Sequence, residues 1–266
     1  MDHAGTPPAA QDSRPAPALP LTLTHPALAA PIVVPADDGA FTREELAQYY
    51  WSLHPRFTFL KLAPRNARLF DIGAAWGRLA FWRDWLSPVR RDIEMHGCDL
   101  HPARFGEQFA AFHVMSVDGA RFPYPDNFFD AIMASHLIEH LRDQPMLARE
   151  IRRTLRPGGM AYLETPAEES LGFPPRVAFI AQGCPTTTIN FADDDTHTAV
   201  VSRAALSELF RAEGFAVQSS GTIRAPYVED ALLTKAVVHR DQELGGYGLW
   251  SKLGFAHYAV FRKPAG

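Results

Sequence analysis

Residues 69–77 read Leu-Phe-Asp-Ile-Gly-Ala-Ala-Trp-Gly, and the fold class follows from this stretch and its surroundings. Residues 69–72 are typical of a buried strand, and residues 76–85 carry a helical pattern. Gly73 and Gly77 predict a tight turn between strand and helix, where missing Cβ atoms let a ligand approach backbone N–H groups. Because such turns also form for purely structural reasons, this stretch alone is a weak indicator of a nucleoside site.

The rest of the chain alternates short apolar runs with helical patterns. One helix is expected before Pro157-Gly158-Gly159, and another after Ser202, which can cap it. Strands that alternate with helices of this length pair in parallel through right-handed crossovers. The sequence therefore predicts an α/β fold with a doubly wound, mostly parallel sheet and helices on both faces. Further strands are predicted at residues 93–98, 112–115, 129–134, 160–164, 215–218 and 258–261.

Composition divides the chain into two parts. Eight of the 22 prolines fall within the first 35 residues, interleaved with alanine, so residues 1–40 are predicted to be a flexible Pro/Ala-rich tail. Order is expected to begin near Thr42, which is placed to cap a helix. Residues 41–266 are predicted to form one domain, with insertions near residues 165–201 and 222–255 that are longer than simple connections.

Charge and cysteine content exclude several classes of partner. With 26 basic and 30 acidic residues the formal charge is −4, so the chain has no excess positive charge for nucleic acid. No stretch approaches the roughly 20 apolar residues that span a bilayer, so no membrane segment is expected. Two cysteines, Cys98 and Cys184, argue against a disulfide scaffold and favour the cytoplasm. The oligomeric state has no indicator in the sequence.

Acidic residues follow the next two predicted strands, where ligands of open α/β sheets bind. Asp99 lies 26 residues after Gly73 and can accept both hydroxyl hydrogens of a ribose, although it can also cap the helix after Pro102. Asp118 can accept from the exocyclic amine of a purine, and turn chemistry alone also explains it. Together with the glycine turn, Asp99 favours a nucleoside ligand.

These motifs resemble those of the class I S-adenosylmethionine-dependent methyltransferases, in particular the broad small-molecule branch. Residues 71–77 resemble the cofactor loop of that family, residues 98–102 its ribose-binding strand end, and Val117-Asp118 its adenine site. Residues 122–141 resemble its fourth-strand block, and residues 155–159 its turn into the fifth strand. The resemblance is strong over residues 69–166 and looser over residues 193–262, and it implies that the insertions near residues 165–201 and 222–255 lie on the side of the methyl acceptor.

The resemblance implies a seven-stranded, Rossmann-like sheet with a final antiparallel strand, and S-adenosylmethionine as cofactor. Two residues depart from the family pattern, since Ala75 replaces a usual second glycine and Ala74 a frequent cysteine. Each alanine adds one methyl group, so we expect cofactor binding to survive. The cofactor site that the resemblance implies consists of Asp71, Gly73, Ala75, Gly77, Asp99, Leu100, Asp118, Gly119 and Ser135.

Two histidines are candidate catalytic residues. His136 follows the fourth strand, where the resemblance implies the reacting centre, and an imidazole can take a proton from the acceptor. Alternatively, His136 and His140 are spaced four residues apart on a helical turn and serve only packing and capping. His197, in the insertion after the fifth strand, is a candidate acid, base or acceptor contact, or part of a solvated acidic loop. No metal is expected, because His136, Glu139 and His140 lack a clear fourth ligand.

The sequence thus predicts an enzyme that transfers a methyl group from S-adenosylmethionine to an oxygen or nitrogen of a small-molecule acceptor. It works by aligning donor and acceptor, with a histidine as a candidate general base. The alternative is a catalytically silent binding or scaffold protein that keeps the fold. A nicotinamide-dependent oxidoreductase is disfavoured because the G-x-G-x-x-G spacing is missing. The identity of the acceptor is not encoded in a recognisable motif.

Overall fold

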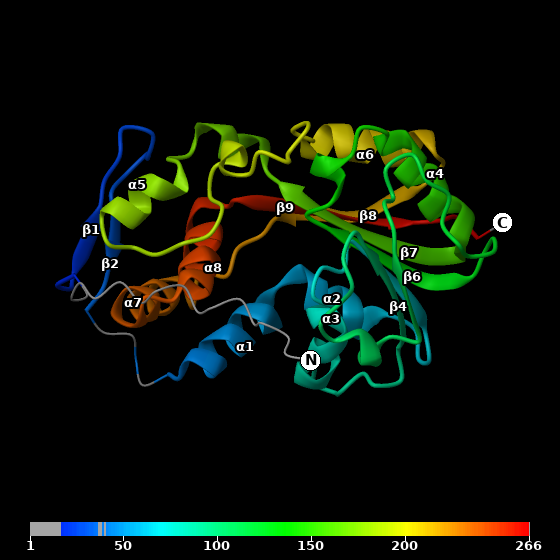
Figure 1. Ribbon diagram of the computed structural model, residues 1–266, viewed down its shortest axis with the longest axis horizontal. Coiled ribbons are helices and arrows are strands. Elements are labelled where there is room, and N and C mark those ends of the chain that lie inside the picture. Colours follow the sequence, from blue (N-terminus) through cyan, green and yellow to red (C-terminus); the bar gives the residue numbers. More distant parts are fainter. Residues whose placement is uncertain (1–16, 37–38, 40, 266) are drawn as a thin grey trace, which may run out of the picture.

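The computed structural model describes residues 17–36, 39 and 41–265, and its centre is a seven-stranded sheet (Figure 1). The strand order is β5-β4-β3-β6-β7-β9-β8, in which β9 runs antiparallel to both of its neighbours and the other pairs are parallel. This arrangement confirms the doubly wound, mostly parallel sheet. The strands are β3 (Arg68–Ile72), β4 (Glu94–Asp99), β5 (Ala111–Val114), β6 (Phe129–Ser135), β7 (Leu155–Pro166), β8 (Ala216–Thr222) and β9 (Ala256–Arg262).

Helices cover both faces of the sheet because side chains alternate along each buried strand. In β3, Leu69 packs with one group of helices, and Phe70 and Ile72 pack with the other. Figure 1 shows α4 (Gln144–Thr154) and α6 (Arg203–Ala212) above the sheet. The opposite face is covered by α1 (Arg43–Leu53), α2 (Pro55–Leu62), α3 (Arg78–Trp82), α7 (Glu229–His239) and α8 (Gln242–Leu253).

The expected caps are present at two helix starts. Thr42 accepts from the backbone N–H of Glu45, whose carboxylate in turn accepts from Thr42, so α1 begins with a capping box. Ser202 accepts from the backbone N–H of Ala205 and caps α6. The helix predicted over residues 76–85 is shorter than expected, because Gly77 at φ +78° delays the start of α3 and a 3-10 turn, η1 (Arg83–Trp85), replaces its end.

The prediction of a flexible tail over residues 1–40 is wrong for residues 17–36, whereas residues 1–16 lie outside the described part. β1 (Leu21–Leu23) and β2 (Ile32–Val34) form an antiparallel pair. Leu23 and Val34 are fully buried against α5 (Arg176–Ala181), α7 and α8. The prolines lie outside the two three-residue strands, so they leave the ladder between them intact.

The two predicted insertions carry elements of their own. The first holds η4 (Glu168–Gly172), α5 and η5 (Phe191–Asp193), and the second holds α7 and α8.

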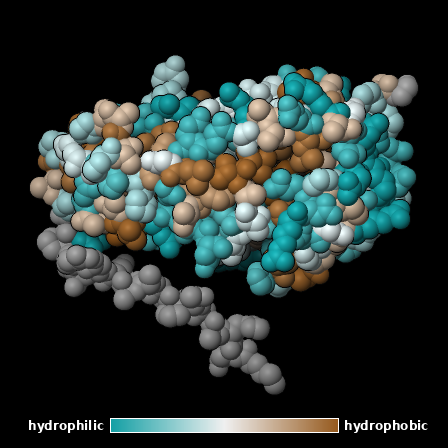
Figure 2. Space-filling view, turned by 90° about the horizontal axis from the view of Figure 1, so that it is seen from above, coloured by the Kyte–Doolittle hydropathy of each residue, from teal (hydrophilic) through white to brown (hydrophobic). Residues whose placement is uncertain are grey.

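On the face seen in Figure 2, hydrophilic residues surround a band of hydrophobic ones. Among the described residues, no helix has both the length and the apolar character needed to cross a bilayer.

Candidate active site

A cavity of about 950 Å³ opens at the carboxyl ends of β3, β4 and β6. The strand order reverses between β3 and β6, which is where open α/β sheets bind their ligands. The cavity therefore lies where the sequence predicts it. The predicted site residues that line it are Asp71, Gly73, Ala75, Asp99, Leu100, Asp118, Ser135 and His136.

The turn after β3 forms one wall of the cavity, and its backbone is left-handed at three positions, Gly73, Ala75 and Gly77. Gly73 has φ +72°, and a Cβ there would lie 3.1 Å from Leu137 Cδ1. Ala75 has φ +47°, which explains why the resembling family usually has glycine at this position. Ala75 holds this conformation while its N–H donates to Asp99 Oδ2 over 2.8 Å. The alanine is therefore accommodated, at a cost in backbone strain.

Asp71 is a buried carboxyl group that lines the cavity. No described residue hydrogen-bonds to its carboxylate. Burial raises the pKa of Asp71 to about 7, although the charge of Arg56 opposes that rise. Ser135 is in a similar position, because its buried hydroxyl has no hydrogen-bond partner among the described residues and it also lines the cavity. Two polar groups thus remain available to a ligand.

Asp99 and Asp118 lie at neighbouring strand ends and already accept backbone hydrogen bonds. Asp99 Oδ1 accepts from the N–H of His101 at 3.1 Å. Asp118 Oδ1 accepts from the N–H groups of Arg142 and Asp143, at 3.0 and 2.9 Å. These bonds orient both carboxylates, and each keeps lone pairs for a further donor. The cap or turn roles considered above therefore coexist with a cavity-facing position.

His136 follows β6 and lies between two buried carboxylates. Its Nε2 lies 2.9 Å from Glu164 Oε1, and its Nδ1 lies 3.4 Å from Glu139 Oε1. Burial lowers the pKa of His136, but the two carboxylates outweigh it and raise that pKa to about 9. His136 is not on a helical turn with His140, since its φ is +49° and the 3-10 helix η3 (Ile138–His140) starts after it.

Arg56 completes this charged group from α2. It donates to both carboxylate oxygens of Glu164, at 2.8 and 2.5 Å, and Tyr162 Oη donates to Glu164 at 2.6 Å. Burial opposes ionisation of Glu164, but Arg56, His54 and His136 hold its pKa well below the usual value. Glu164 therefore stays a carboxylate, and His136 and Arg56 place positive charge beside the cavity.

Three predicted residues do not line the cavity. Gly77 serves packing, because a Cβ there would lie 2.8 Å from Phe109 Cε2. Gly119 has φ +67° and follows Asp118 in its turn. The side chain of His197 is 6% exposed, and its Nδ1 lies 2.7 Å from the carbonyl oxygen of Phe191. The structure therefore does not bring His197 to the cavity.

Several cavity residues have no counterpart among the predicted site residues. Trp51 of α1 and Tyr247 and Trp250 of α8 form an aromatic wall, and Arg56 and Arg78 also line the space. Glu164 does not line the cavity but contacts Arg56 and His136, and it could have been found because it lies near the carboxyl end of β7 at the same edge of the sheet. Trp51, Arg56 and Arg78 belong to α1, α2 and α3, on either side of β3 in the chain. Tyr247 and Trp250 belong to α8, inside the predicted insertion over residues 222–255.

The residues fit S-adenosylmethionine as a ligand of this cavity. Asp71 and Ser135 offer unpartnered polar groups, and a side chain at Gly73 would approach Leu137 closely. The fold and the strand-end site together define a class I methyltransferase, the class that the sequence motifs resemble. Residues 43–220, well over half of the chain, match the family model described as a methyltransferase domain. The chain belongs to that family, and S-adenosylmethionine is the cofactor that the membership implies.

Individual relatives share this class with the chain. A probable S-adenosylmethionine-dependent methyltransferase of Mycolicibacterium smegmatis is 28% identical over 172 residues, 64% of this chain and 61% of that protein. A chain from the complex between the Haloferax volcanii Trm112 methyltransferase activator and a candidate methyltransferase has a TM-score of 0.57 at 18% identity. That match covers 83% of this chain and 93% of the other. The [4+2]-cyclase SpnF has a TM-score of 0.55 at 18% identity, over 86% of both chains.

These similarities differ in what they establish. The chain spans about three fifths of the length of the M. smegmatis protein, so the match covers only part of that relative. At 18% identity the two solved structures show the fold alone, and one of them is a cyclase. The comparisons therefore establish the family and the fold, and the acceptor has to be argued from the cavity.

Proposed function

We propose that this protein transfers a methyl group from S-adenosylmethionine to an oxygen or nitrogen of a small-molecule acceptor. The observation that carries the proposal is that one cavity joins the strand-end carboxylates Asp71, Asp99 and Asp118 to the aromatic wall of α8. Its volume of about 950 Å³ is at the upper end of the roughly 300–1,000 Å³ range of ligand pockets. That size suits a donor together with a small acceptor.

The donor half lies against the turn after β3. Asp71 would accept from the donor's amino group, Asp99 from the ribose hydroxyls and Asp118 from the adenine amine. Leu100, which is 63% exposed and lines the cavity, would cover one side of the adenine ring. Bound there, S-adenosylmethionine supplies an electrophilic methyl group on a sulfonium centre. The protein's task is to bring an acceptor atom into line with it.

The acceptor half lies between α1, α8 and the loop around Thr196. Trp51, Tyr247 and Trp250 present ring surface to this part of the cavity, while Thr196 and Thr198 supply hydroxyl groups. Aromatic walls with few polar groups favour a compact organic acceptor and help to exclude water. The net charge of −4 makes a nucleic acid a poor candidate.

His136 is proposed to act through its charge and position. Carboxylate oxygens lie 2.9 Å from its Nε2 and 3.4 Å from its Nδ1 and raise its pKa to about 9, so at neutral pH both ring nitrogens carry a proton and neither has a lone pair for the proton of an acceptor. Its side chain is 23% exposed and lines the cavity. A positively charged wall there would favour an acceptor oxygen that carries negative charge as it attacks.

A catalytically silent relative of the methyltransferases remains the alternative, because Ala75 replaces a usual glycine in the cofactor turn. Calorimetry with S-adenosylmethionine, S-adenosylhomocysteine and NAD separates the two. Binding of the first two in the micromolar range, and no binding of NAD, supports a methyltransferase and justifies an acceptor screen with isotope-labelled donor. No binding of any of the three would favour the silent relative.

Variants of Asp99 locate the donor within the cavity. Asp99→Ala is expected to weaken the affinity for S-adenosylhomocysteine at least about tenfold. The variant removes the carboxylate to which the ribose hydroxyls would donate charge-assisted hydrogen bonds. Asp99→Asn keeps an oxygen that can accept from Ala75 and separates this role from turn stability. Asp126→Asn is the control, because Asp126 is 65% exposed and lies outside the cavity lining. Unchanged affinity in both Asp99 variants would contradict the ribose assignment.

A further inference from the structure

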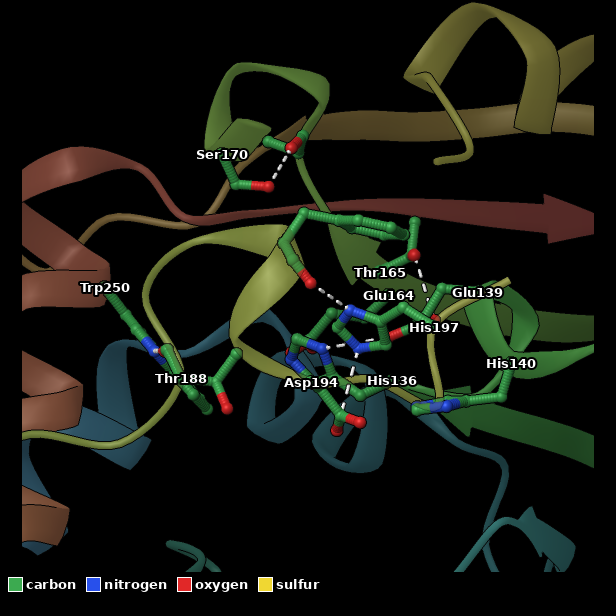
Figure 3. A network of polar contacts seen from close by, with 12 residues as sticks. His136, Glu139, His140, Glu164, Thr165, Ser170, Thr188, Asp194, His197 and Trp250 are labelled. Atoms are coloured by element: carbon green, nitrogen blue, oxygen red, sulfur yellow. Dashed lines mark hydrogen bonds and ion pairs between the residues drawn. The ribbon is translucent and has the colours of Figure 1, made fainter. Parts of the chain in front are cut away.

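Glu139, His140 and His197 form a cluster beside the acceptor half of the cavity. One ligand atom of each residue lies within 4.8 Å of the ligand atoms of the other two. Glu139 and His140 come from η3, and His197 follows η5, so the loop after β7 brings the set together (Figure 3). This cluster differs from the three ligands considered from the sequence, since His197 takes the place of His136.

The hydrogen bonds of His140 define its tautomer. Thr196 Oγ1 donates its single proton to Asp194 Oδ1 over 2.6 Å. The same hydroxyl oxygen lies 2.9 Å from His140 Nδ1, so it can only accept there, and His140 Nδ1 must carry the proton. In the neutral imidazole, Nε2 of His140 therefore has a free lone pair.

His197 has the same arrangement through a different partner. Its Nδ1 lies 2.7 Å from the backbone carbonyl oxygen of Phe191, which can only accept, so Nδ1 is again the protonated nitrogen. Its Nε2 lone pair is then free, with Asp194 Oδ2 3.9 Å away. A histidine whose second ring nitrogen donates to a carbonyl or a held hydroxyl is oriented in the way that metal-ligating histidines are.

Glu139 supplies the negative charge of the cluster. Its side chain is fully buried, and Oε2 accepts from Thr165 Oγ1 at 2.9 Å. Oε1 is buried without a hydrogen-bond partner among the described residues, and its nearest cationic group is His136 Nδ1 at 3.4 Å. The backbone carbonyl of Glu139 accepts from the N–H and hydroxyl of Thr198, which fixes the 190s loop beside it.

We propose that Glu139, His140 and His197 bind a divalent transition metal ion, with Asp194 as a further oxygen donor. Two imidazoles and a carboxylate are a donor set that Zn²⁺, Fe²⁺ and Mn²⁺ accept. Zinc bonds of about 2.0–2.1 Å place tetrahedral ligand atoms roughly 3.4 Å apart, so the side chains close by about an ångström on binding. His140 lines the cavity, as do Thr196 and Thr198, so the cluster borders the cavity on one side.

Metal binding can be measured without donor or acceptor. Tag-free protein is treated with EDTA, dialysed and titrated with Zn²⁺ by calorimetry, and Co²⁺ is used to obtain a visible absorption spectrum. One equivalent of Zn²⁺ is expected to bind, raise the midpoint of thermal unfolding and displace the Co²⁺ spectrum. The outcome says nothing about methyl transfer, so failure of this proposal and failure of the proposed function are distinguishable.

Matched variants locate the site. His140→Asn and His197→Asn keep an N–H donor where Nδ1 lies and remove the lone pair of Nε2. Each of these variants, and also Glu139→Gln, is expected to weaken Zn²⁺ affinity at least about tenfold. His101→Asn is the control, because His101 lies on the exposed turn after β4, and it is expected to leave Zn²⁺ affinity unchanged. Wild-type protein that binds Zn²⁺ and Co²⁺ no better than a folded His140→Asn/His197→Asn double variant would overturn the proposal.

Discussion

Arg56 forms a bidentate ion pair with Glu164, 108 residues further along the chain, beside the cavity. The side chain of Arg56 is 14% exposed and that of Glu164 is 1% exposed. Removing Arg56 leaves the buried Glu164 carboxylate with His136 as its remaining cationic partner, so its charge is only partly compensated. Arg56→Met is therefore expected to lower the free energy of unfolding by up to about 3–5 kcal/mol, measured by urea denaturation.

Two further variants test whether the loss comes from the charge left behind. Arg56→Met/Glu164→Gln removes both charges and is expected to be more stable than Arg56→Met alone. Arg91→Met, in the exposed pair of Arg91 with Asp84, is expected to change little. Equal stability of the single and double Arg56 variants would show that packing, and not the buried charge, accounts for the effect.

The left-handed backbone at Ala75 leads to a prediction about the cofactor turn. Glycine adopts φ +47° without the Cβ clash, so Ala75→Gly is expected to raise the free energy of unfolding by about 1 kcal/mol. Ala74→Gly is the control, since Ala74 does not have a positive φ and should lose stability. Urea denaturation of the three proteins measures both effects. A less stable Ala75→Gly protein would mean that the alanine methyl contributes packing that exceeds the backbone strain.

Asp71 makes stability depend on pH. Its pKa is about 7 in the folded protein and 3.8 for an unperturbed aspartate, so the folded state binds more protons between these two pH values. The contribution of Asp71 is therefore fully present below about pH 4 and is lost as the pH rises through 7. Ionisation of Asp71 lowers the free energy of unfolding of the wild type by about 4 kcal/mol at most. Asp71→Asn cannot ionise, so it is expected to be more stable than wild type at pH 8.

The measurement is urea denaturation of wild type and Asp71→Asn from pH 5 to pH 8, because the difference between the two proteins cancels the titration of other groups. The difference is expected to grow with pH. Asp126→Asn, which changes an exposed carboxylate, should run parallel to wild type over this range. Parallel curves for Asp71→Asn as well would contradict a raised pKa for Asp71.

The strands of the sheet could be predicted because each has an apolar run next to a glycine, proline or acidic residue. β7 begins before the predicted strand over residues 160–164, because Leu155 already pairs with Phe129 and the N–H of Gly158 donates to the carbonyl oxygen of Lys263. Gly158 has φ +77°, and the register with β6 shifts before Met160. The pairing of β1 with β2 could not be predicted from the number of prolines in the first 35 residues. What mattered was their position, which leaves two short strands free to pair.

The donor half of the site was predictable residue by residue, whereas for the acceptor half only the insertions near residues 165–201 and 222–255 were predictable. Asp71, Asp99 and His136 follow strands, and the topology of the sheet brings strand ends together. Arg56 and Trp250 come from helices outside the sheet, and only tertiary packing places them at the cavity. The same holds for His197, whose neighbour His140 is 57 residues away and whose tautomer depends on a backbone carbonyl.

The role of His136 can be separated from donor binding once the screen has found an acceptor. His136→Gln removes the charge beside Glu164, so turnover is expected to fall while the affinity for S-adenosylhomocysteine changes less than about threefold. His136→Lys keeps a positive charge and is expected to retain more turnover than His136→Gln. A general base would predict instead that both variants lose roughly a hundredfold or more. Measuring kcat, KM and product affinity for both variants decides between a charged wall and a proton acceptor.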